Sequence, residues 1–227
     1  MAEAVCEIVE IRLCESGSTV RFDLPPGMIP AAGEYLLGCG VDGSEILPVV
    51  LYLTQAGEDG SVFYGDIPQQ WTPGVKVWLR GPAGKGFRLP AQARKVALGS
   101  LSGQFSPLLP VAQQAIDQSA AVSLFCERMP QILPSEVEAL PLEALADAWS
   151  WADYAAFEAK IEQIDQIGRL LALKGTSRPP FLAEILILSS FACAGAADCG
   201  VCAVKTDGRY RLCCRDGPVF DLHALEF

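Results

Sequence analysis

Five of the nine cysteines in this chain lie within the twenty-two residues from Cys193 to Cys214. The segment reads Cys-Ala-Gly-Ala-Ala-Asp-Cys-Gly-Val-Cys from Cys193 and Cys-Cys-Arg-Asp-Gly-Pro-Val-Phe from Cys213. Thiolates repel one another, so four of them that converge need a cation between them. The segment therefore predicts a metal centre. We expect an iron–sulfur cluster, and with it an electron-carrying protein.

The spacing of the cysteines favours a two-iron cluster. Five residues separate Cys193 from Cys199, and two separate Cys199 from Cys202. A further cysteine follows a predicted hairpin of residues 201–205 and 210–212. Small residues at 194–197 suit a loop whose backbone N–H groups bond to cluster sulfur. The pattern is similar to the plant-type two-iron spacing, with five residues in place of four between the first two ligands.

Three other interpretations remain open at this point. A structural zinc site also takes four cysteines, although zinc ribbons usually present two Cys-x-x-Cys knuckles and this segment has one. A redox Cys-x-x-Cys normally opens a helix after a strand, which Cys199–Cys202 is not expected to do. The cysteines could also be inert and buried. Because successive residues of a strand point to opposite faces, only one of Cys213 and Cys214 is expected to face the centre.

Composition narrows the class of protein. Hydrophobic residues make up 51% of the 227 positions and charged residues 19%, which is typical of a globular chain. A net charge of −10 argues against nucleic acid or an anionic membrane as partner. No signal peptide is visible at the N-terminus, and the longest apolar run, of about 14 residues, is too short to span a bilayer. Nine cysteines without such a signal predict a reducing, cytoplasmic location.

The first 90 residues predict a small β-barrel. Short alternating segments are separated by turn signals such as Asp42-Gly43 and Pro73-Gly74 at roughly ten-residue intervals. We expect a six-stranded antiparallel barrel. Its strands are expected near residues 5–11, 19–24, 35–39, 47–55, 61–64 and 75–80.

The pattern changes to α/β after Ala91. Strands are expected at 95–99 and 121–126, with a helix from Pro107 to about Gln118 between them, which is the order of a βαβ unit. Residues 140–148 and 157–173 are predicted to be helical, and 182–188 forms a buried segment that leads into the cysteines. The predicted organisation is a barrel at 1–90, an α/β domain of nucleotide-binding type at 91–188, and an iron–sulfur module at 189–227.

Two motifs give the chain a family resemblance. A cysteine followed by Arg215-Asp216-Gly217-Pro218-Val219-Phe220 resembles the electron-transfer subunit (PyrK type) of bacterial dihydroorotate dehydrogenase, within the ferredoxin reductase-like flavoproteins. Residues 81–87, Gly-Pro-Ala-Gly-Lys-Gly-Phe, resemble that family's Gly-Pro-Leu-Gly-Asn-Gly-Phe. The resemblance implies a [2Fe–2S] cluster held by Cys193, Cys199, Cys202 and Cys214, with Cys213 facing away.

The resemblance also implies partners and further cofactors. A catalytic subunit containing FMN oxidises dihydroorotate in pyrimidine biosynthesis, and electrons pass through the cluster to FAD and then to NAD⁺. Such subunits work in oligomeric complexes. Residues 47–50, Leu-Pro-Val-Val, take the place of the family's Arg-Pro-x-Ser-like flavin motif, without its cation or hydroxyl. The candidate flavin contacts are therefore Pro48, Val49, Val50, Gly65, Asp66 and Ile67.

The nucleotide loop departs from the family in the same way. Relatives carry a Gly-Gly-Gly-x-Gly-x-x-Pro-like turn that lets backbone approach a phosphate. Here Gly99–Pro107 contains the bulky Leu101 and Phe105, so we do not expect NAD to bind. These departures leave an alternative function open: a scaffold or regulatory relative that kept the fold and lost its flavin and nucleotide sites. The single histidine, His223, lies in the tail and gives no support to a histidine-based catalytic site.

Overall fold

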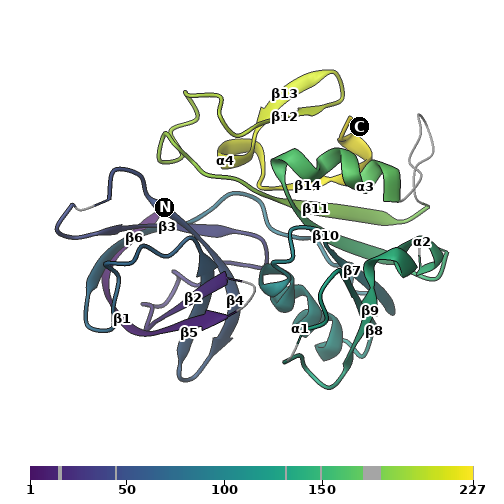
Figure 1. Cartoon of the computed structure of the whole chain (residues 1–227), viewed down its shortest axis with the longest axis horizontal. Coiled ribbons are helices and arrows are strands. Elements are labelled where there is room, and N and C mark those ends of the chain that lie inside the picture. The colour runs from purple at the N-terminus through teal and green to yellow at the C-terminus, as the bar shows by residue number, and fades with distance from the viewer. Residues whose placement is uncertain (15–16, 44, 131, 149, 171–179, 227) are drawn as a thin grey trace.

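The computed structural model describes the chain except for residues 15–16, 44, 131, 149, 171–179 and 227. The N-terminal part, residues 2–83, is a closed barrel in the strand order β1-β2-β5-β4-β3-β6 (Figure 1), with every neighbouring pair antiparallel. The predicted six-stranded barrel is confirmed. Its strands are β1 (Ala2–Cys14), β2 (Gly17–Phe22), β3 (Tyr35–Gly40), β4 (Val49–Gly57), β5 (Gly60–Gly65) and β6 (Lys76–Ala83).

Alternation along the strands fills the barrel and sets its outer surface. In β6, Val77 and Leu79 are fully buried inside, whereas Lys76 and Trp78 point outward. This follows from the two-residue period of a strand, which sends successive side chains to opposite faces. The interior is closed by aromatic side chains, because Phe22 packs against Phe63 and Trp71 with ring centroids 6.2 and 6.4 Å apart.

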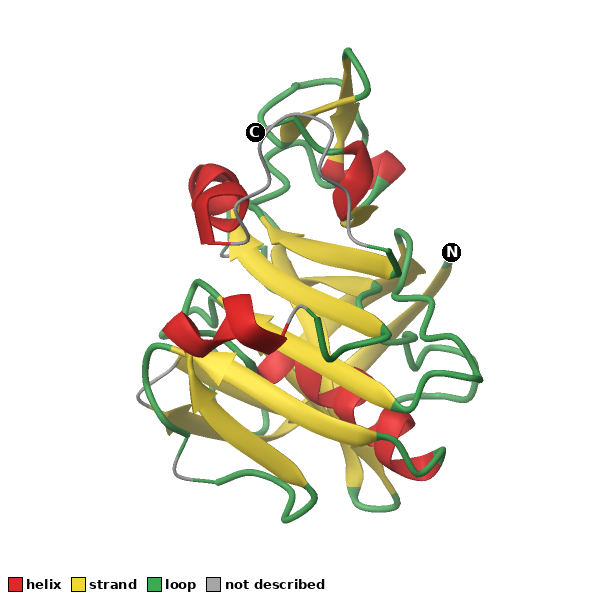
Figure 2. Ribbon diagram, turned by 90° about the vertical axis from the view of Figure 1, so that its right-hand side faces the viewer, coloured by secondary structure: helices red, strands yellow, loops and turns green. Residues whose placement is uncertain are grey.

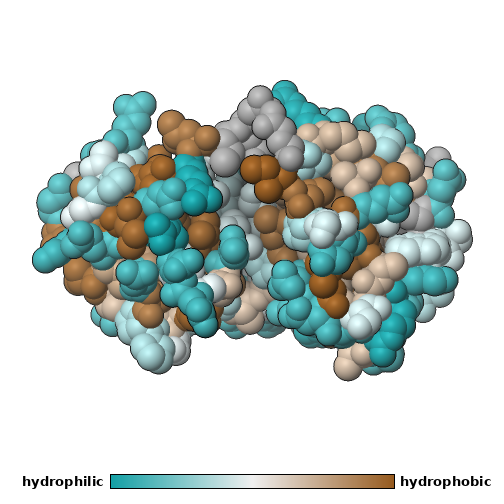
Figure 3. Space-filling model, turned by 90° about the horizontal axis from the view of Figure 1, so that it is seen from below, coloured by the Kyte–Doolittle hydropathy of each residue, from teal (hydrophilic) through white to brown (hydrophobic). Residues whose placement is uncertain are grey.

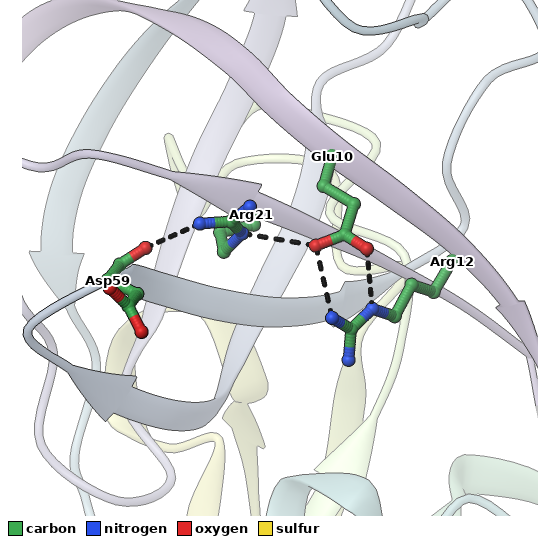
Figure 4. A network of polar contacts seen from close by, with 4 residues as sticks. All are labelled: Glu10, Arg12, Arg21 and Asp59. Atoms are coloured by element: carbon green, nitrogen blue, oxygen red, sulfur yellow. Dashed lines mark hydrogen bonds and ion pairs between the residues drawn. The ribbon is translucent and has the colours of Figure 1, made fainter.

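A charged network lies on the outer surface where β1 meets β2 (Figure 4). The guanidinium of Arg12 donates to the Glu10 carboxylate at 2.7 and 3.2 Å, and Arg21 Nε donates to the same carboxylate at 3.2 Å. Arg21 Nη1 also donates to the carbonyl oxygen of Asp59 at 2.6 Å, which ties the β4–β5 turn to β2. The exposed ion pairs contribute little stability, so this network mainly fixes strand register.

The second half contains a six-stranded sheet in the order β14-β11-β10-β7-β8-β9, parallel except for β14. The predicted strand–helix–strand unit is present as β7, α1 and β8. The sheet strands are β7 (Lys95–Ser100), β8 (Ala121–Cys126), β9 (Val137–Pro141), β10 (Tyr154–Lys160), β11 (Leu182–Leu188) and β14 (Val219–Asp221). The helical segments are η1 (Ser106–Leu108), α1 (Leu109–Asp117), η2 (Leu142–Ala144), α2 (Leu145–Ala148), η3 (Ile161–Gln163) and α3 (Ile164–Leu170).

The helix predicted at 157–173 is partly wrong. Residues 157–160 belong to β10, a strand buried on both faces between β7 and β11, and helix begins only at Ile161. A strand covered on both faces has no polar face, so its sequence lacks the alternation that identifies strands. Residues 171–173 lie outside the described part of the chain. The predicted helix at 140–148 is nearly right, because β9 runs to Pro141 and η2 and α2 follow.

The remaining residues build a small module that lies over both the barrel and the sheet (Figure 1). It consists of the cysteine loop at 193–202, the predicted hairpin of β12 (Ala203–Thr206) and β13 (Arg209–Leu212), and the short helix α4 (Cys213–Asp216). We call residues 191–216 the cysteine module. After it, β14 returns to pair with β11, and η4 (Leu222–Ala224) follows. The division of the chain at residues 90 and 188 stays a prediction.

The views agree on where the module lies. Figure 2 shows its hairpin at one end of the molecule, beyond the edge of the sheet and next to the C-terminus. The face away from the module carries apolar residues scattered among hydrophilic ones (Figure 3). None of the helices in the described part of the chain has the length and apolarity that a membrane crossing requires.

Candidate iron–sulfur site

The structure brings the four predicted ligands together. The sulfur atoms of Cys193 and Cys199 lie within 4.8 Å of each other, and the Cys214 thiol interacts with the thiols of Cys202 and Cys193. All four are free thiols. Cys199 is exposed, Cys193 is half-buried, and Cys202 and Cys214 are buried. The group therefore spans the distance from the protein surface to the interior of the module, and two segments contribute to it: the cysteine loop, which supplies three thiols, and α4, which supplies Cys214.

The thiol pKa values show why such a group favours a cation. Burial, followed by the neighbouring Cys202 and Cys193 thiols, raises the pKa of the Cys214 thiol to about 12. The pKa of Cys193 is lowered to about 7, first by the backbone N–H of Asp198 and then by the Cys199 thiol and neighbouring backbone. Cys193 is thus the thiol that loses its proton most readily near neutral pH. The ligand set as a whole can lose its protons only when a cation offsets the repulsion.

The conformation of the cysteine loop is unusual for its residues. Ala194 and Ala197 have φ values of 53° and 64°, in the left-handed region that residues with a Cβ seldom adopt. In this conformation the backbone N–H groups of Ala197, Asp198 and Cys199 bond to the Cys193 sulfur, which suits an anionic thiolate, whereas those of Ala194 and Ala196 bond to the carbonyl oxygens of Phe191 and Cys193. The sequence places small side chains at residues 194–197. The donor set and the loop geometry both fit an iron–sulfur cluster.

The choice between Cys213 and Cys214 has a different physical basis from the one predicted. The two residues begin α4 and are not part of a strand, so successive side chains point about 100° apart around a helical turn instead of to opposite faces. Cys214 is the one placed against both Cys202 and Cys193. Cys213 is fully buried, and burial, followed by the neighbouring Cys202 and Cys214, raises its pKa far above the usual range. This geometry favours Cys214 as the fourth ligand.

Sequence reasoning missed Asp198. A carboxylate oxygen of Asp198 and the sulfur atoms of Cys193 and Cys199 all lie within 4.8 Å of one another. The sequence did hold a signal for it, because Asp198 directly precedes the predicted ligand Cys199. An aspartate at this position keeps the outer edge of the centre polar and adds negative charge beside the thiolates. Such charge makes reduction of a bound metal centre less favourable.

The barrel holds the cysteine module through outward-facing side chains. Tyr35 Oη donates to the carbonyl oxygen of Cys214 at 2.8 Å, and the Tyr35 ring meets Phe191 edge-on with centroids 4.7 Å apart. Arg80 donates through its guanidinium to the carbonyl oxygen of Ala194. The two ends of the ligand set are therefore bonded to β3 and β6 of the barrel. Neither contact could be found from sequence, because 179 and 114 positions separate the partners.

The loop after β6 makes the third attachment. The N–H of Lys85 donates to the carbonyl oxygen of Gly217 at 2.7 Å, immediately after α4. Gly84 has a φ of +82°, and a Cβ at this position would lie 2.5 Å from Pro218 Cδ and 2.8 Å from the Gly217 oxygen. The two motifs that carry the family resemblance, at 81–87 and 215–220, are therefore in direct contact. The contact explains why glycine is needed at position 84.

The six candidate flavin contacts lie side by side but offer poor phosphate ligands. Val49 points into the barrel core, and Val50 packs against the core that contains the cysteines. A Cβ on Gly65 would lie 2.6 Å from the Val50 oxygen. Asp66 is exposed and negative, and Pro48 and Ile67 are half-buried. With Leu47 in place of a cation, this set does not fit a flavin pyrophosphate except through backbone groups.

Three tyrosines also lie on the outer face of the barrel beside those residues, where the rest of the protein covers them. Tyr35, Tyr52 and Tyr64 are cross-strand neighbours on β3, β4 and β5, and Tyr52 is only 3% exposed. Its hydroxyl has no hydrogen-bond partner among the described residues. Burial raises the pKa of Tyr52 well above the usual value, with Cys213 and Tyr35 acting in the same direction. The space between β4 and the cysteines is therefore filled by protein side chains.

The nucleotide loop is closed by a buried carboxylate. Glu158 on β10 is fully buried and accepts hydrogen bonds from the Ser100 and Ser102 hydroxyls and from the Ser102 N–H at 3.3 Å. Leu101 is buried in the same loop. A phosphate at this turn would meet Glu158 and lose the N–H donors that a nucleotide loop provides. These residues do not fit a dinucleotide, and sequence reasoning had identified Leu101 but not Glu158.

A known protein domain matches the segment of the chain that contains the four cysteines. Residues 191–226 match the iron–sulfur cluster binding domain of dihydroorotate dehydrogenase B. No curated protein sequence matches the chain.

Among solved structures, an NADH-dependent reduced ferredoxin–NADP oxidoreductase is similar at a TM-score of 0.72 and 14% identity, over 98% of this chain and 90% of that one. A ferredoxin NADP⁺ reductase from Neisseria gonorrhoeae, with bound FAD and NADP, has a TM-score of 0.59 and 14% identity, over 82% and 99%. The ferredoxin reductase of carbazole 1,9a-dioxygenase has a TM-score of 0.63 and 16% identity, over 78% and 67%.

Identities this low show the fold, and FAD is a cofactor that proteins of this fold can bind. The family resemblance is thus confirmed in both its parts. The chain has the fold of the ferredoxin reductase-like flavoproteins, and its residues 191–226 match the iron–sulfur cluster binding domain of dihydroorotate dehydrogenase B.

Proposed function

We propose that this chain is the electron-transfer subunit of an oxidoreductase, with a [2Fe–2S] cluster held by Cys193, Cys199, Cys202 and Cys214. The observation that carries the proposal is the proximity of these free thiols: Cys193 and Cys199 lie within 4.8 Å of each other, and Cys214, from a separate segment, interacts with Cys202 and Cys193. Such a cluster supplies one-electron redox chemistry. By the family match of residues 191–226, the partner is a catalytic subunit of the FMN-containing dihydroorotate dehydrogenase type, acting in pyrimidine biosynthesis in the cytoplasm.

Each part of the module has a role in this proposal. The four thiolates would hold the iron, and the backbone N–H groups of Ala197, Asp198 and Cys199 bond to the sulfur of Cys193. Tyr35 and Arg80 are positioning residues, because they bond the carbonyl oxygens of Cys214 and Ala194 and fix the ligands relative to the barrel. The exposed Cys199 marks the edge at which a partner can approach.

No step of the proposal passes through FAD or NAD. The candidate flavin residues lack a charged phosphate donor, and Glu158 stands in the nucleotide turn. Flavin binding therefore stays a prediction, to be settled by extracting the purified protein with acid and measuring released FAD.

The test of the cluster is analysis of anaerobically purified protein. We expect equal amounts of iron and acid-labile sulfide, a brown colour, and an electron paramagnetic resonance signal after reduction with dithionite. Cys214→Ser should lower the iron content and alter the signal. The matched control Cys126→Ser replaces a buried free thiol in β8, outside the site, and should leave both unchanged. Zinc without sulfide would contradict the proposal.

A second candidate function is a scaffold that kept the fold without its cofactors. Leu47, Val50 and the Glu158 carboxylate favour it, since each removes a contact that a flavin or a nucleotide would use. Protein that contains neither iron nor flavin after anaerobic purification would support the scaffold and exclude the electron carrier.

A further inference from the structure

In the described part of the chain, one group of three side chains is close enough to share a metal ion, and it includes a carboxylate. An oxygen of Asp198 and the sulfur atoms of Cys193 and Cys199 lie within 4.8 Å of one another. Atoms that bind one tetrahedral metal ion, each about 2.0–2.3 Å from it, are about 3.3–3.8 Å apart. Movements of about 1 Å therefore suffice to bring all three onto a single ion. Among the described residues, neither Cys202 nor Cys214 belongs to a group of three this close.

The main chain of the cysteine loop holds this carboxylate beside the two sulfur atoms. The N–H of Asp198 bonds to the sulfur of Cys193, as do the N–H groups of Ala197 and Cys199. Ala197 turns the chain at a φ of 64°, and the N–H of Ala196 donates to the carbonyl oxygen of Cys193 at 3.0 Å. The backbone that carries Asp198 is therefore bonded to the first thiol, and this keeps the carboxylate within reach of both sulfur atoms.

The Asp198 carboxylate is also available to bind a metal. It is exposed, and it makes no hydrogen bond or ion pair with the residues that the structure describes. Asp216, in the short helix that contains Cys214, differs in this respect. Its carboxylate accepts hydrogen bonds from the Leu212 N–H at 2.9 Å and from the Arg215 guanidinium at 3.2 and 3.3 Å. Asp198 would give up only its hydration on binding a metal, whereas Asp216 would lose its protein partners.

The exposed side of the centre is where a ligand can be exchanged. Cys199 is exposed, as Asp198 is, whereas Cys202 and Cys214 are buried. A thiolate at the surface can leave a metal and be solvated by water, but a buried thiolate would be left without solvent. Carboxylate oxygens bind iron in non-haem sites, and a carboxylate has the same single negative charge as a thiolate. Asp198 can therefore take the place of Cys199 without changing the charge of the ligand set.

We propose that Asp198 is a reserve ligand of the cysteine centre, whose carboxylate oxygen binds the metal in place of the Cys199 thiolate. This inference rests on the proposed function, because it concerns the same centre. In the exchange, the metal–sulfur bond to Cys199 breaks and a metal–oxygen bond to Asp198 forms. The oxidation state of the metal is unchanged, and the released thiolate takes a proton from water. The exchange keeps the metal in the module when its exposed thiol is lost.

The test is the metal content of anaerobically purified variants of the whole chain. Cys199→Ala removes the thiol that Asp198 is proposed to replace, and it opens no cavity because this side chain is exposed. This variant should keep most of the wild-type iron and sulfide, with visible absorption and electron paramagnetic resonance altered by an oxygen ligand. Cys199→Ala/Asp198→Asn should lower the iron content about tenfold or more. Cys199→Ala/Asp207→Asn is the matched control, because it removes an exposed aspartate from the β12–β13 turn of the same module, and it should behave like Cys199→Ala.

Urea unfolding midpoints are measured for every variant, so that iron contents are compared between folded proteins. Iron that is retained in Cys199→Ala and is lost only when Asp198 is also replaced supports the reserve ligand. Equal iron contents and equal spectra of the two double variants overturn it. Loss of the cluster from Cys199→Ala, while the wild type holds it, also overturns this inference and leaves the electron carrier standing. A wild type without a cluster overturns the proposed function, and this inference with it.

Discussion

Replacing Gly84 with alanine should loosen the contact between the barrel and the cysteine module. At φ +82° a residue with a Cβ is strained by about 1–2 kcal/mol relative to glycine. In addition, the new Cβ would lie 2.5 Å from Pro218 Cδ, 2.8 Å from the Gly217 oxygen and 2.9 Å from Tyr35 Cε1. Overpacking of this kind costs about 1–3 kcal/mol. The expected loss in the free energy of unfolding is therefore about 2–5 kcal/mol.

Gly27→Ala is the matched control for the backbone strain. Gly27 has a φ of +85°, and nothing lies within 4 Å of its Cβ position, so alanine there is strained without being crowded. Both substitutions reduce the conformational entropy of the unfolded chain equally, and that contribution cancels between them. The two variants should thus differ by the overpacking cost alone, about 1–3 kcal/mol.

The assay is equilibrium urea unfolding of the wild type and both variants, followed by tryptophan fluorescence, with iron content measured on the same preparations. Gly84→Ala should also lower the iron content, because Pro218 and Gly217 follow directly after α4, which contains Cys214. Equal losses of stability for Gly84→Ala and Gly27→Ala would refute the argument that a tight contact between 84 and 217–218 holds the module.

Two further predictions concern single buried groups. Tyr35→Phe leaves the carbonyl oxygen of Cys214 without its hydrogen-bond donor and should lower the free energy of unfolding, measured in urea, by about 1–3 kcal/mol. Tyr210→Phe is the control, because the Tyr210 ring is exposed, and it should not lower that free energy. Equal stability of the two variants would show that the 2.8 Å hydrogen bond contributes nothing. Burial raises the pKa of Glu158 above its usual 4.5, so its contribution to stability is complete at low pH and is lost as pH rises from about 4.5 through the raised value. Glu158→Gln should therefore gain stability relative to the wild type as pH rises, measured as urea midpoints across pH. The exposed Glu58→Gln is the control, and a pH-independent difference for Glu158→Gln would contradict the reasoning.

Local patterns in the sequence were sufficient for the barrel and for the hairpin of the cysteine module. Alternation such as Val77–Leu79 inside and Lys76–Trp78 outside is visible in a single strand, and turn residues mark the ends. The spacing of Cys193, Cys199 and Cys202 likewise predicted the centre, because those ligands come from one short loop. The same method failed at 157–160, where both faces of the strand are covered and the sequence shows no period of two.

The sequence by itself thus determined the kind of centre this protein can hold, since thiol type and spacing are local properties. Only the tertiary structure shows that Cys214 lies beside Cys202 and Cys193, how the module is held, and what closes the nucleotide loop. Cys214, Tyr35 and Glu158 act through partners that lie 12 to 179 positions away in the chain. Contacts at such separations depend on how β3, β6, β7 and β10 are placed in space, and no local pattern records that placement.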